Sequence, residues 1–302
     1  MKVIKVTPRG YCKGVVRAIS IAKQCAKEYP EQPITVLGML VHNEYVKKAL
    51  EAKGIHTVED AAKTRMQLLD DIHEGIVIFT AHGISDEVKE KAMEKGLHCI
   101  DASCPDVVKT QNLVRDHLQK GYEIFYIGKQ HHPEAEAVCA LSDHIHLITS
   151  IDDIPKDIHS PLFVTNQTTM SIFDVERIFQ QIQKDYPDAC LSEEICNATR
   201  IRQQAVADLK NKNVDVLYVV GDSHSNNSKR LAQIGKEQGI PHVYRIDDVY
   251  GIQAEQLMDC STVAVTSGAS TPTYLTNQVI EVLEHWEETI TFPTICIEKM
   301  ID

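Results

Sequence analysis

Three cysteines recur at equal intervals along the chain, and this regularity constrains the fold more than any other feature. The same interval of 92 residues separates Cys12 from Cys104 and Cys104 from Cys196. Apolar residues follow each cysteine at the 3.6-residue spacing of an amphipathic helix, as Val15 and Ile19 do after Cys12. The spacing therefore predicts three copies of one structural unit.

Each predicted helix is followed by two apolar strands that end in polar loops. The first strand of each unit lies in the segments 34–43, 122–134 and 214–228. The second ends in a threonine and a loop of small residues, in the segments 76–85, 162–171 and 263–272. Strands that alternate with helices predict an α/β fold with small parallel sheets, whose ligands bind beyond the carboxyl ends of the strands. We therefore expect three pseudo-threefold-related lobes whose cysteines and polar loops face one central cavity. The alternative is an ordinary α/β protein, in which similar loops recur only because the same fold elements recur.

The repeat also predicts where the lobes begin and end. We expect lobe 1 over residues 1–103 with Cys12, lobe 2 over 104–195 with Cys104 and Glu134, lobe 3 over 196–284 with Cys196, and a C-terminal tail over 285–302. The repeat does not place the tail, which could pack near the mouth of the cavity.

Three equivalent cysteines without a fourth partner favour a 4Fe-4S cluster with one open iron. Such clusters are held by Cys thiolates, and a helix N-terminus stabilises the thiolate form. Two other interpretations stay open at this point: each cysteine is a small buried hydrophobe, or the set binds zinc. No C-x-x-C pair is present, which gives a structural zinc site little support.

The polar loops contain hydrogen-bond donors and few cations, of which Lys129 and Lys229 are the only close ones. Such His, Ser, Thr and Asn side chains could hold a diphosphate. In the H-P-E segment Glu134 could donate a proton, with Thr168 relaying it to the substrate. Glu136, two residues further on, is a competing candidate for the acid.

Composition narrows the classes of partner. The formal net charge is −12, which argues against a nucleic-acid binder, because such a protein needs a basic face. No window has the length of apolar sequence that a membrane span needs, and no signal peptide is visible, so we expect a cytoplasmic protein without membrane contact. No nicotinamide or flavin motif is visible. Electrons for a redox reaction would therefore come from a partner of the ferredoxin or flavodoxin class.

Nine motifs in order give the chain a resemblance to a known enzyme family. They are PRGYCKGVVRAI, LGMLVHN, FTAHGIS, IDASCPDV, HHPEAEA, TNQTTMS, EICNATRIRQ, GDSHSNNSKRL and GASTP, and they run from residue 8 to residue 272. The chain resembles the 4-hydroxy-3-methylbut-2-enyl diphosphate reductases, oxidoreductases that complete the non-mevalonate route of isoprene biosynthesis. Each motif alone is weak, but nine in family order, with all three cysteines placed, are specific.

The resemblance implies roles for individual residues. It implies a trilobal fold around one 4Fe-4S cluster, bound by Cys12, Cys104 and Cys196, with the substrate hydroxyl on the open iron. It implies that Glu134 delivers protons while Thr168 holds the hydroxyl. It further implies diphosphate contacts from His42, His82, His132, Ser225, Asn226, Asn227 and Ser270. The reaction would remove the allylic hydroxyl as water, with two electrons and two protons, and give isopentenyl and dimethylallyl diphosphates.

Four positions depart from the family pattern. The family pattern also allows Ser at the position of Asn226, and both side chains can donate a hydrogen bond. His131 and Ala137 stand where Gly is usual, which bears on the conformation of the loop 128–138. Thr273 replaces an acidic residue and has no assigned role.

Two rival functions are compatible with three cysteines. One is an enzyme of the quinolinate synthase type, in which the open iron promotes dehydration without added electrons. The other is a non-catalytic iron–sulfur sensor or carrier, which would have no need of Glu134 or Thr168.

Overall fold

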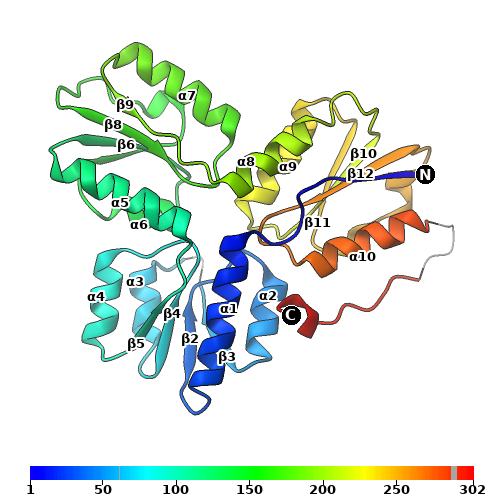
Figure 1. Cartoon of the computed structure of the whole chain (residues 1–302), viewed down its shortest axis with the longest axis horizontal. Helices are drawn as coiled ribbons and strands as arrows, with labels where there is room; N and C mark the ends of the chain where they lie inside the picture. The colour runs from blue at the N-terminus through cyan, green and yellow to red at the C-terminus, as the bar shows by residue number, and fades with distance from the viewer. Residues whose placement is uncertain (61, 287–290) are drawn as a thin grey trace. The chain divides into compact units, whose positions relative to one another are not determined.

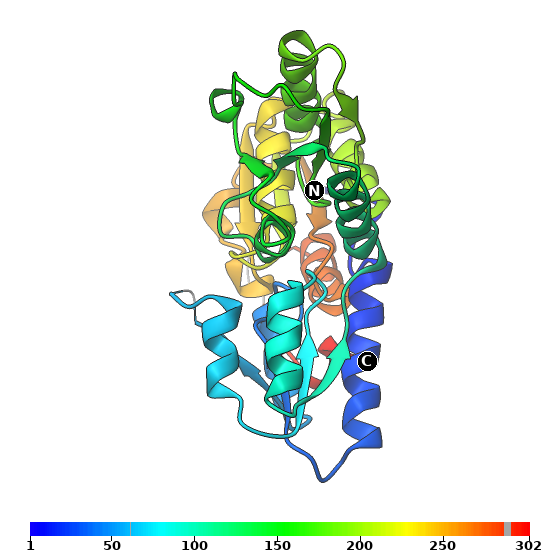
Figure 2. The same cartoon turned by 90° about the vertical axis from the view of Figure 1, so that its left-hand side faces the viewer.

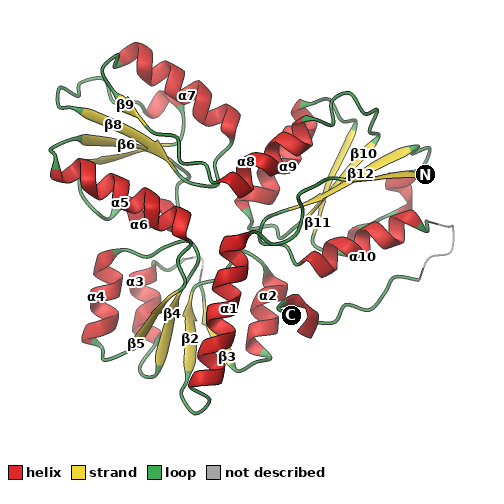
Figure 3. Ribbon diagram, in the orientation of Figure 1, coloured by secondary structure: helices red, strands yellow, loops and turns green. Residues whose placement is uncertain are grey.

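Three separate sheets, each of four parallel strands, organise the chain (Figures 1 and 3). The structure is a computed structural model that describes residues 1–60, 62–286 and 291–302. It divides into two compact units. The first unit comprises Met1–Val16, Val41–Lys53 and Asn197–Asp302, and the second comprises Arg17–Leu40 and Gly54–Cys196.

One sheet of the second unit has the order β3-β2-β4-β5. Its strands are β2 (Ile34–Leu37), β3 (Ile55–Val58), β4 (Ile76–Phe79) and β5 (His98–Asp101). Strand β4 is an uninterrupted apolar run, IVIF, and is buried throughout, as a strand covered on both faces requires. The helices α3 (Arg65–Leu68) and α4 (Asp86–Glu94) pack on one face through Leu68 and Val88, and α1 (Lys13–Glu28) lies on the other side (Figure 2).

The second sheet of this unit has the order β7-β6-β8-β9. Its strands are β6 (Glu123–Ile127), β7 (Ile145–Ile148), β8 (Leu162–Asn166) and β9 (Cys190–Leu191). Alternate residues of β6 face opposite sides, because side chains alternate along a strand. Phe125 packs with α7 (Ile172–Asp185) on one face, and Tyr126 packs with α5 (Pro105–Gln119) and α6 (Pro133–Cys139) on the other (Figure 1).

The first unit contains the third sheet, with the order β1-β12-β10-β11. Its strands are β1 (Lys2–Lys5), β10 (Val216–Val220), β11 (His242–Ile246) and β12 (Thr262–Ser267). The helices α8 (Asn197–Ala207) and α9 (Asn226–Glu237) pack on it through Val206 and Leu231, and α10 (Thr273–Glu284) packs against β1 and β12. The helix α2 (Glu44–Glu51) also belongs to this unit.

The repeated order of strands confirms the predicted α/β fold with parallel sheets. In each sheet the first strand of the repeat pairs with an outer strand and with the threonine-ended strand, and a short edge strand completes the sheet. That edge strand lies just before a cysteine in sequence, since β5 precedes Cys104, β9 precedes Cys196 and β1 precedes Cys12. The outer strands β3, β7 and β11 were not predicted. The expected lobe boundaries stay a prediction.

The end of the chain packs on the first unit. The tail was left unplaced by the sequence, and its residues 287–290 lie outside the described part of the structure. Beyond them, Met300 and Ile301 are buried. The Tyr11 hydroxyl donates to the Met300 carbonyl at 2.6 Å, and the Tyr274 hydroxyl donates to the Thr294 carbonyl at 3.2 Å. The first bond ties the last residues to the segment next to Cys12, and the second ties them to α10.

Candidate active site

A buried carboxyl group in the second unit has the surroundings of an acid catalyst. Glu134 is only 1 % exposed and lies in the first turn of α6, directly after Pro133. The Thr168 backbone N–H donates to its Oε1 at 2.7 Å, and the Thr168 hydroxyl donates to its Oε2 at 2.9 Å. The Tyr126 hydroxyl donates to Oε1 at 3.4 Å.

Burial decides the ionisation of this carboxyl group. Removal from water disfavours the charged form and raises the pKa of Glu134 to about 7, although the bonds from Thr168 and Tyr126 favour the carboxylate. The group therefore holds and releases a proton near neutral pH, as a general acid must. Of the two carboxylates left open by the sequence, Glu134 is the one beside Thr168, whereas Glu136 is exposed.

Two histidine rings of the second unit lie against each other, and one of them belongs to the residue that caps α6. His132 caps α6, and its Nδ1 accepts a hydrogen bond from the Glu134 backbone N–H at 3.2 Å. A neutral imidazole that accepts at Nδ1 carries its proton on Nε2, so His132 has a ring N–H to donate. The ring of His82, which follows β4, lies edge-to-face with that of His132, with 5.7 Å between the centroids. The structure thus brings together four predicted site residues of the second unit.

The preceding residue, His131, has a backbone conformation that favours glycine. Its φ is 59°, in the left-handed region, where glycine is free of the Cβ clash. His131 therefore adopts a turn that glycine would adopt without strain. Ala137, the other departure in this loop, is buried within α6. Neither residue prevents Glu134 from reaching Thr168.

The first unit gathers a second set of predicted residues at the start of α9. Ser225 caps the helix by accepting from the Ser228 backbone N–H at 3.3 Å, and Asn226 and Asn227 form its first turn. All three are buried. Neither side-chain oxygen nor nitrogen of Asn227 has a hydrogen-bond partner within the described residues. A buried amide without a partner is costly, and a helix N-terminus attracts anions, so this turn suits an anionic ligand.

Two further predicted residues of the first unit lie on neighbouring loops. The Ser270 hydroxyl donates to the His42 carbonyl at 3.0 Å. The Glu44 backbone N–H donates to Asp222 Oδ2 at 2.9 Å, which ties the loop after His42 to the loop before Ser225. Asp222 and Tyr126 were not among the predicted site residues, because their role depends on contacts between segments far apart in the chain.

The three equally spaced cysteines have the same backbone setting in each repeat. The N–H of each donates at 3.0 Å to a carbonyl in the loop that follows a threonine-ended strand. The pairs are Cys12 with Ala269, Cys104 with Ala81, and Cys196 with Thr168. Each thiol is partly exposed, and none of the nine cysteines, all in the described part of the chain, forms a disulfide.

The chemistry of these thiols suits iron–sulfur ligation. Within the described residues, no three Cys, His, Asp or Glu side chains lie close enough to hold one metal ion. Partly exposed thiols ahead of helix N-termini suit the thiolate form that iron binds.

One negative finding concerns membranes. In residues 1–60, 62–286 and 291–302, no helix combines the length and the hydropathy needed to cross a bilayer.

Comparison with known proteins gives a consistent result. The model of the LytB protein family matches residues 3–284. A protein named 4-hydroxy-3-methylbut-2-enyl diphosphate reductase from Anoxybacillus flavithermus is 49 % identical over 291 residues, covering 95 % of this chain and 91 % of its own. Proteins of the same name from Geobacillus kaustophilus and Brevibacillus brevis are 48 % and 47 % identical, each over 95 % of this chain and over 91 % and 93 % of their own.

Solved structures agree with the sequence relatives. The E-1-hydroxy-2-methyl-but-2-enyl-4-diphosphate reductase of Plasmodium falciparum superposes with a TM-score of 0.87 and 30 % identity, covering 99 % of this chain and 96 % of that one. A structure titled as (E)-4-hydroxy-3-methyl-but-2-enyl diphosphate reductase has a TM-score of 0.65 and 28 % identity, with coverage of 94 % and 100 %. The resemblance inferred from the nine sequence motifs is confirmed, and the chain belongs to the LytB protein family.

Proposed function

We propose that the chain is a reductase that converts 4-hydroxy-3-methylbut-2-enyl diphosphate into isopentenyl and dimethylallyl diphosphates. Relatives of 47–49 % identity over 95 % of the chain have the corresponding name. The observation that carries the proposal is the buried Glu134 carboxyl group, bonded to both the N–H and the hydroxyl of Thr168. Loss of a hydroxyl group as water needs a proton donor in such a place.

We assign one 4Fe-4S cluster to the chain, with Cys12, Cys104 and Cys196 as its ligands. The equivalent backbone bonds of the three cysteines support this assignment. When bound, a cluster with three thiolate ligands would supply one-electron transfer and an iron with an open position for the substrate oxygen.

Glu134 and Thr168 would supply the protons. The Thr168 hydroxyl can hold the substrate hydroxyl and also bonds Glu134 Oε2 at 2.9 Å, so a proton has a short route from the carboxyl group to the leaving oxygen. Because burial raises the pKa of Glu134 to about 7, the carboxyl group is partly protonated under neutral conditions. The reaction consumes two protons and two electrons, and releases one water.

Neutral donors would hold the diphosphate in place of a cluster of cations. We assign this contact to His42, His82, His132, Ser225, Asn226, Asn227 and Ser270, whereas Thr168 would bind the substrate at its hydroxyl group. The helix N-terminus at Ser225 adds a partial positive charge, and Asn227 has a buried amide without a partner among the described residues.

The source of the electrons would be another protein. A ferredoxin or a flavodoxin is the class that fits one-electron delivery, and no nucleic acid or membrane is required. A cytoplasmic location stays a prediction.

Electron paramagnetic resonance tests the cofactor assignment. Anaerobically purified protein is reduced with dithionite, and spectra are recorded with and without 4-hydroxy-3-methylbut-2-enyl diphosphate. We expect a reduced-cluster signal that changes when the diphosphate is added. A protein without iron, or with a signal indifferent to the diphosphate, would contradict the proposal.

A further inference from the structure

Arg65 is a charged residue that lies outside the nine sequence motifs. It is the first residue of α3, and burial lowers the pKa of its guanidinium to about 10, which leaves it charged at neutral pH. Its Nη1 donates to the carbonyl of Leu37 at the end of β2 and, at 3.4 Å, to the hydroxyl of Thr80 at the end of β4. Arg65 therefore joins the carboxyl ends of two strands, the edge from which the predicted ligand loops leave.

Gly38 leaves the space that this arrangement needs. Its φ is +87°, and a Cβ added there would lie 2.7 Å from Arg65 Cζ. A side chain at residue 38 would displace the guanidinium, so the glycine and the arginine fit each other.

Thr80 connects Arg65 to His82. The Thr80 hydroxyl is fully buried, and its oxygen lies 3.4 Å from His82 Nδ1. A guanidinium can only donate, so Thr80 Oγ1 accepts from Arg65 and keeps its own hydrogen to give. Within the described residues Thr80 Oγ1 has no other partner than Arg65 and His82. The hydroxyl hydrogen therefore goes to His82 Nδ1, which leaves the ring proton on Nε2.

The other two repeats show that this chain of bonds is not a by-product of the fold. Thr165 and Thr266 occupy the same position at the ends of β8 and β12, and both are fully buried. Neither Oγ1 has a hydrogen-bond partner in the described parts of the chain. Among the described residues, the side chain of the strand-end threonine forms hydrogen bonds only in the first repeat, where Arg65 is one of its partners.

We propose that Arg65 and Thr80 are positioning residues that fix His82 as its Nε2–H tautomer, so that the ring donates to the substrate's diphosphate. This inference rests on the proposed function. It makes His82 equivalent to His132, whose Nδ1 accepts from a backbone N–H. Two neutral imidazoles with matching tautomers then offer ring N–H groups from neighbouring positions.

Kinetics of matched variants test the proposal. Thr80→Val keeps the shape of the side chain and removes the relay, while Thr80→Ser keeps the hydroxyl. We expect Thr80→Val to raise KM for the diphosphate about tenfold with kcat changed less than about threefold, since a binding contact is lost. Thr80→Ser should recover most of the affinity. Thr165→Val and Thr266→Val are the controls, and each should stay within about twofold of the parent chain.

A double-mutant cycle tests the coupling between the two residues. If Arg65 acts through Thr80, then Arg65→Met combined with Thr80→Val should raise KM no further than Thr80→Val alone.

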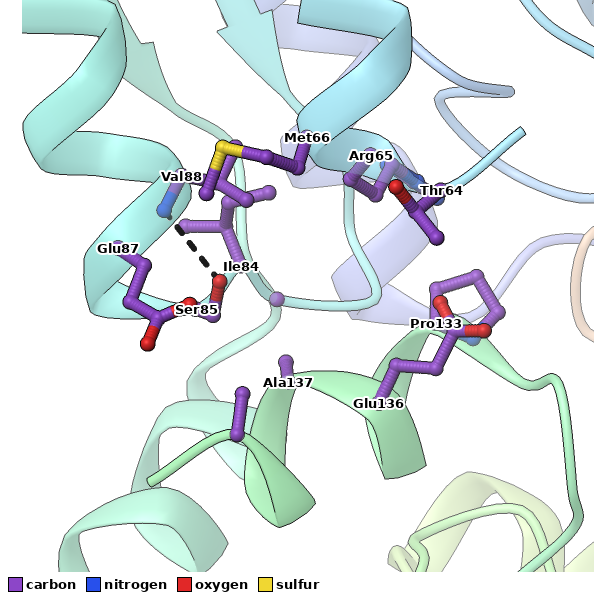
Figure 4. A pocket seen from close by; sticks show the side chains of 12 residues that line it. Thr64, Arg65, Met66, Ile84, Ser85, Glu87, Val88, Pro133, Glu136 and Ala137 are labelled. Carbon is purple, nitrogen blue, oxygen red and sulfur yellow. Dashed lines mark hydrogen bonds between the residues drawn. The ribbon is translucent and has the colours of Figure 1, made fainter. Parts of the chain in front are cut away.

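Arg65 also lines a pocket of about 390 Å³ between α4 and α6, with Ser85 and Glu136 among its other walls (Figure 4). Guanidinium ion should therefore enter an Arg65→Ala variant and lower its KM, whereas sodium ion at the same concentration should not.

The outcomes separate this inference from the proposed function. If the parent chain turns over the diphosphate while Thr80→Val keeps its KM, or the control variants lose as much affinity, the relay is refuted. If the parent chain has no turnover, the proposed function fails, and the same variants are compared by calorimetric binding of inorganic diphosphate. Equal affinity of the parent chain and Thr80→Val in that experiment would also refute the relay.

Discussion

Replacement of Glu134 by Gln should stabilise the protein and abolish its activity together. The amide keeps the size of the side chain and can still accept from the Thr168 backbone N–H, but it cannot ionise. The pKa of Glu134 is raised from 4.5 in the unfolded chain to about 7, so the folded state binds more protons between those values. Stability of the parent chain therefore falls as the pH rises through this window.

The size of the effect follows from the shift. At about 1.4 kcal/mol per pKa unit, the ionised carboxylate costs the folded state about 3 kcal/mol at pH 8 and only about 1 kcal/mol at pH 5. Glu134→Gln should therefore gain about 2 kcal/mol relative to the parent chain between pH 5 and pH 8.

Thermal unfolding of both proteins under anaerobic conditions, at steps from pH 5 to pH 8, measures this difference. The gap between their midpoint temperatures should widen as the pH rises, while turnover of the variant is nearly lost and its iron content is unchanged. A gap that is constant with pH would show that burial does not raise the pKa of Glu134. Near-normal turnover would refute its role as the proton donor.

Three further predictions concern other residues. Cys104→Ser should lose cluster and activity together, as measured by iron and sulfide content after anaerobic purification, and a full iron complement would contradict the ligand assignment. Asn227→Ala should raise KM for the diphosphate without lowering the midpoint of thermal unfolding, because its amide has no partner among the described residues; an unchanged KM would remove it from the binding set. Met300→Ala should destabilise the protein by about 2–5 kcal/mol in urea unfolding, since the side chain is buried, and a smaller loss would mean that the tail does not stay packed.

The repeat made much of the fold predictable. The inner strands such as IVIF and VLYVV are unbroken apolar runs, and their spacing after each cysteine identified the repeating unit. The outer strands were missed because segments such as IHTV and HVYRI are half exposed and mix polar with apolar residues. The pairing of β1 with β12 joins the two ends of the chain, and no local pattern contains that information.

The sequence predicted which residue types belong to the candidate site, but it predicted few of the contacts between them. Glu134 followed from its motif, but its choice over Glu136 required the burial and the bonds to Thr168 that only the folded chain has. Arg65 lies in the segment KTRMQLLDD, where an arginine is typical of a solvated helix. Its contact with Thr80 depends on the packing of α3 against the ends of β2 and β4.

The proposed reaction itself is tested most directly by reductant-dependent product formation. Anaerobically purified protein is mixed with 4-hydroxy-3-methylbut-2-enyl diphosphate and a one-electron reductant such as dithionite-reduced methyl viologen, and the products are identified by nuclear magnetic resonance. The account predicts isopentenyl and dimethylallyl diphosphates, with two electrons consumed for each molecule formed and no product without the reductant. Unchanged substrate in the presence of a full cluster, or product that forms without added electrons, would contradict it.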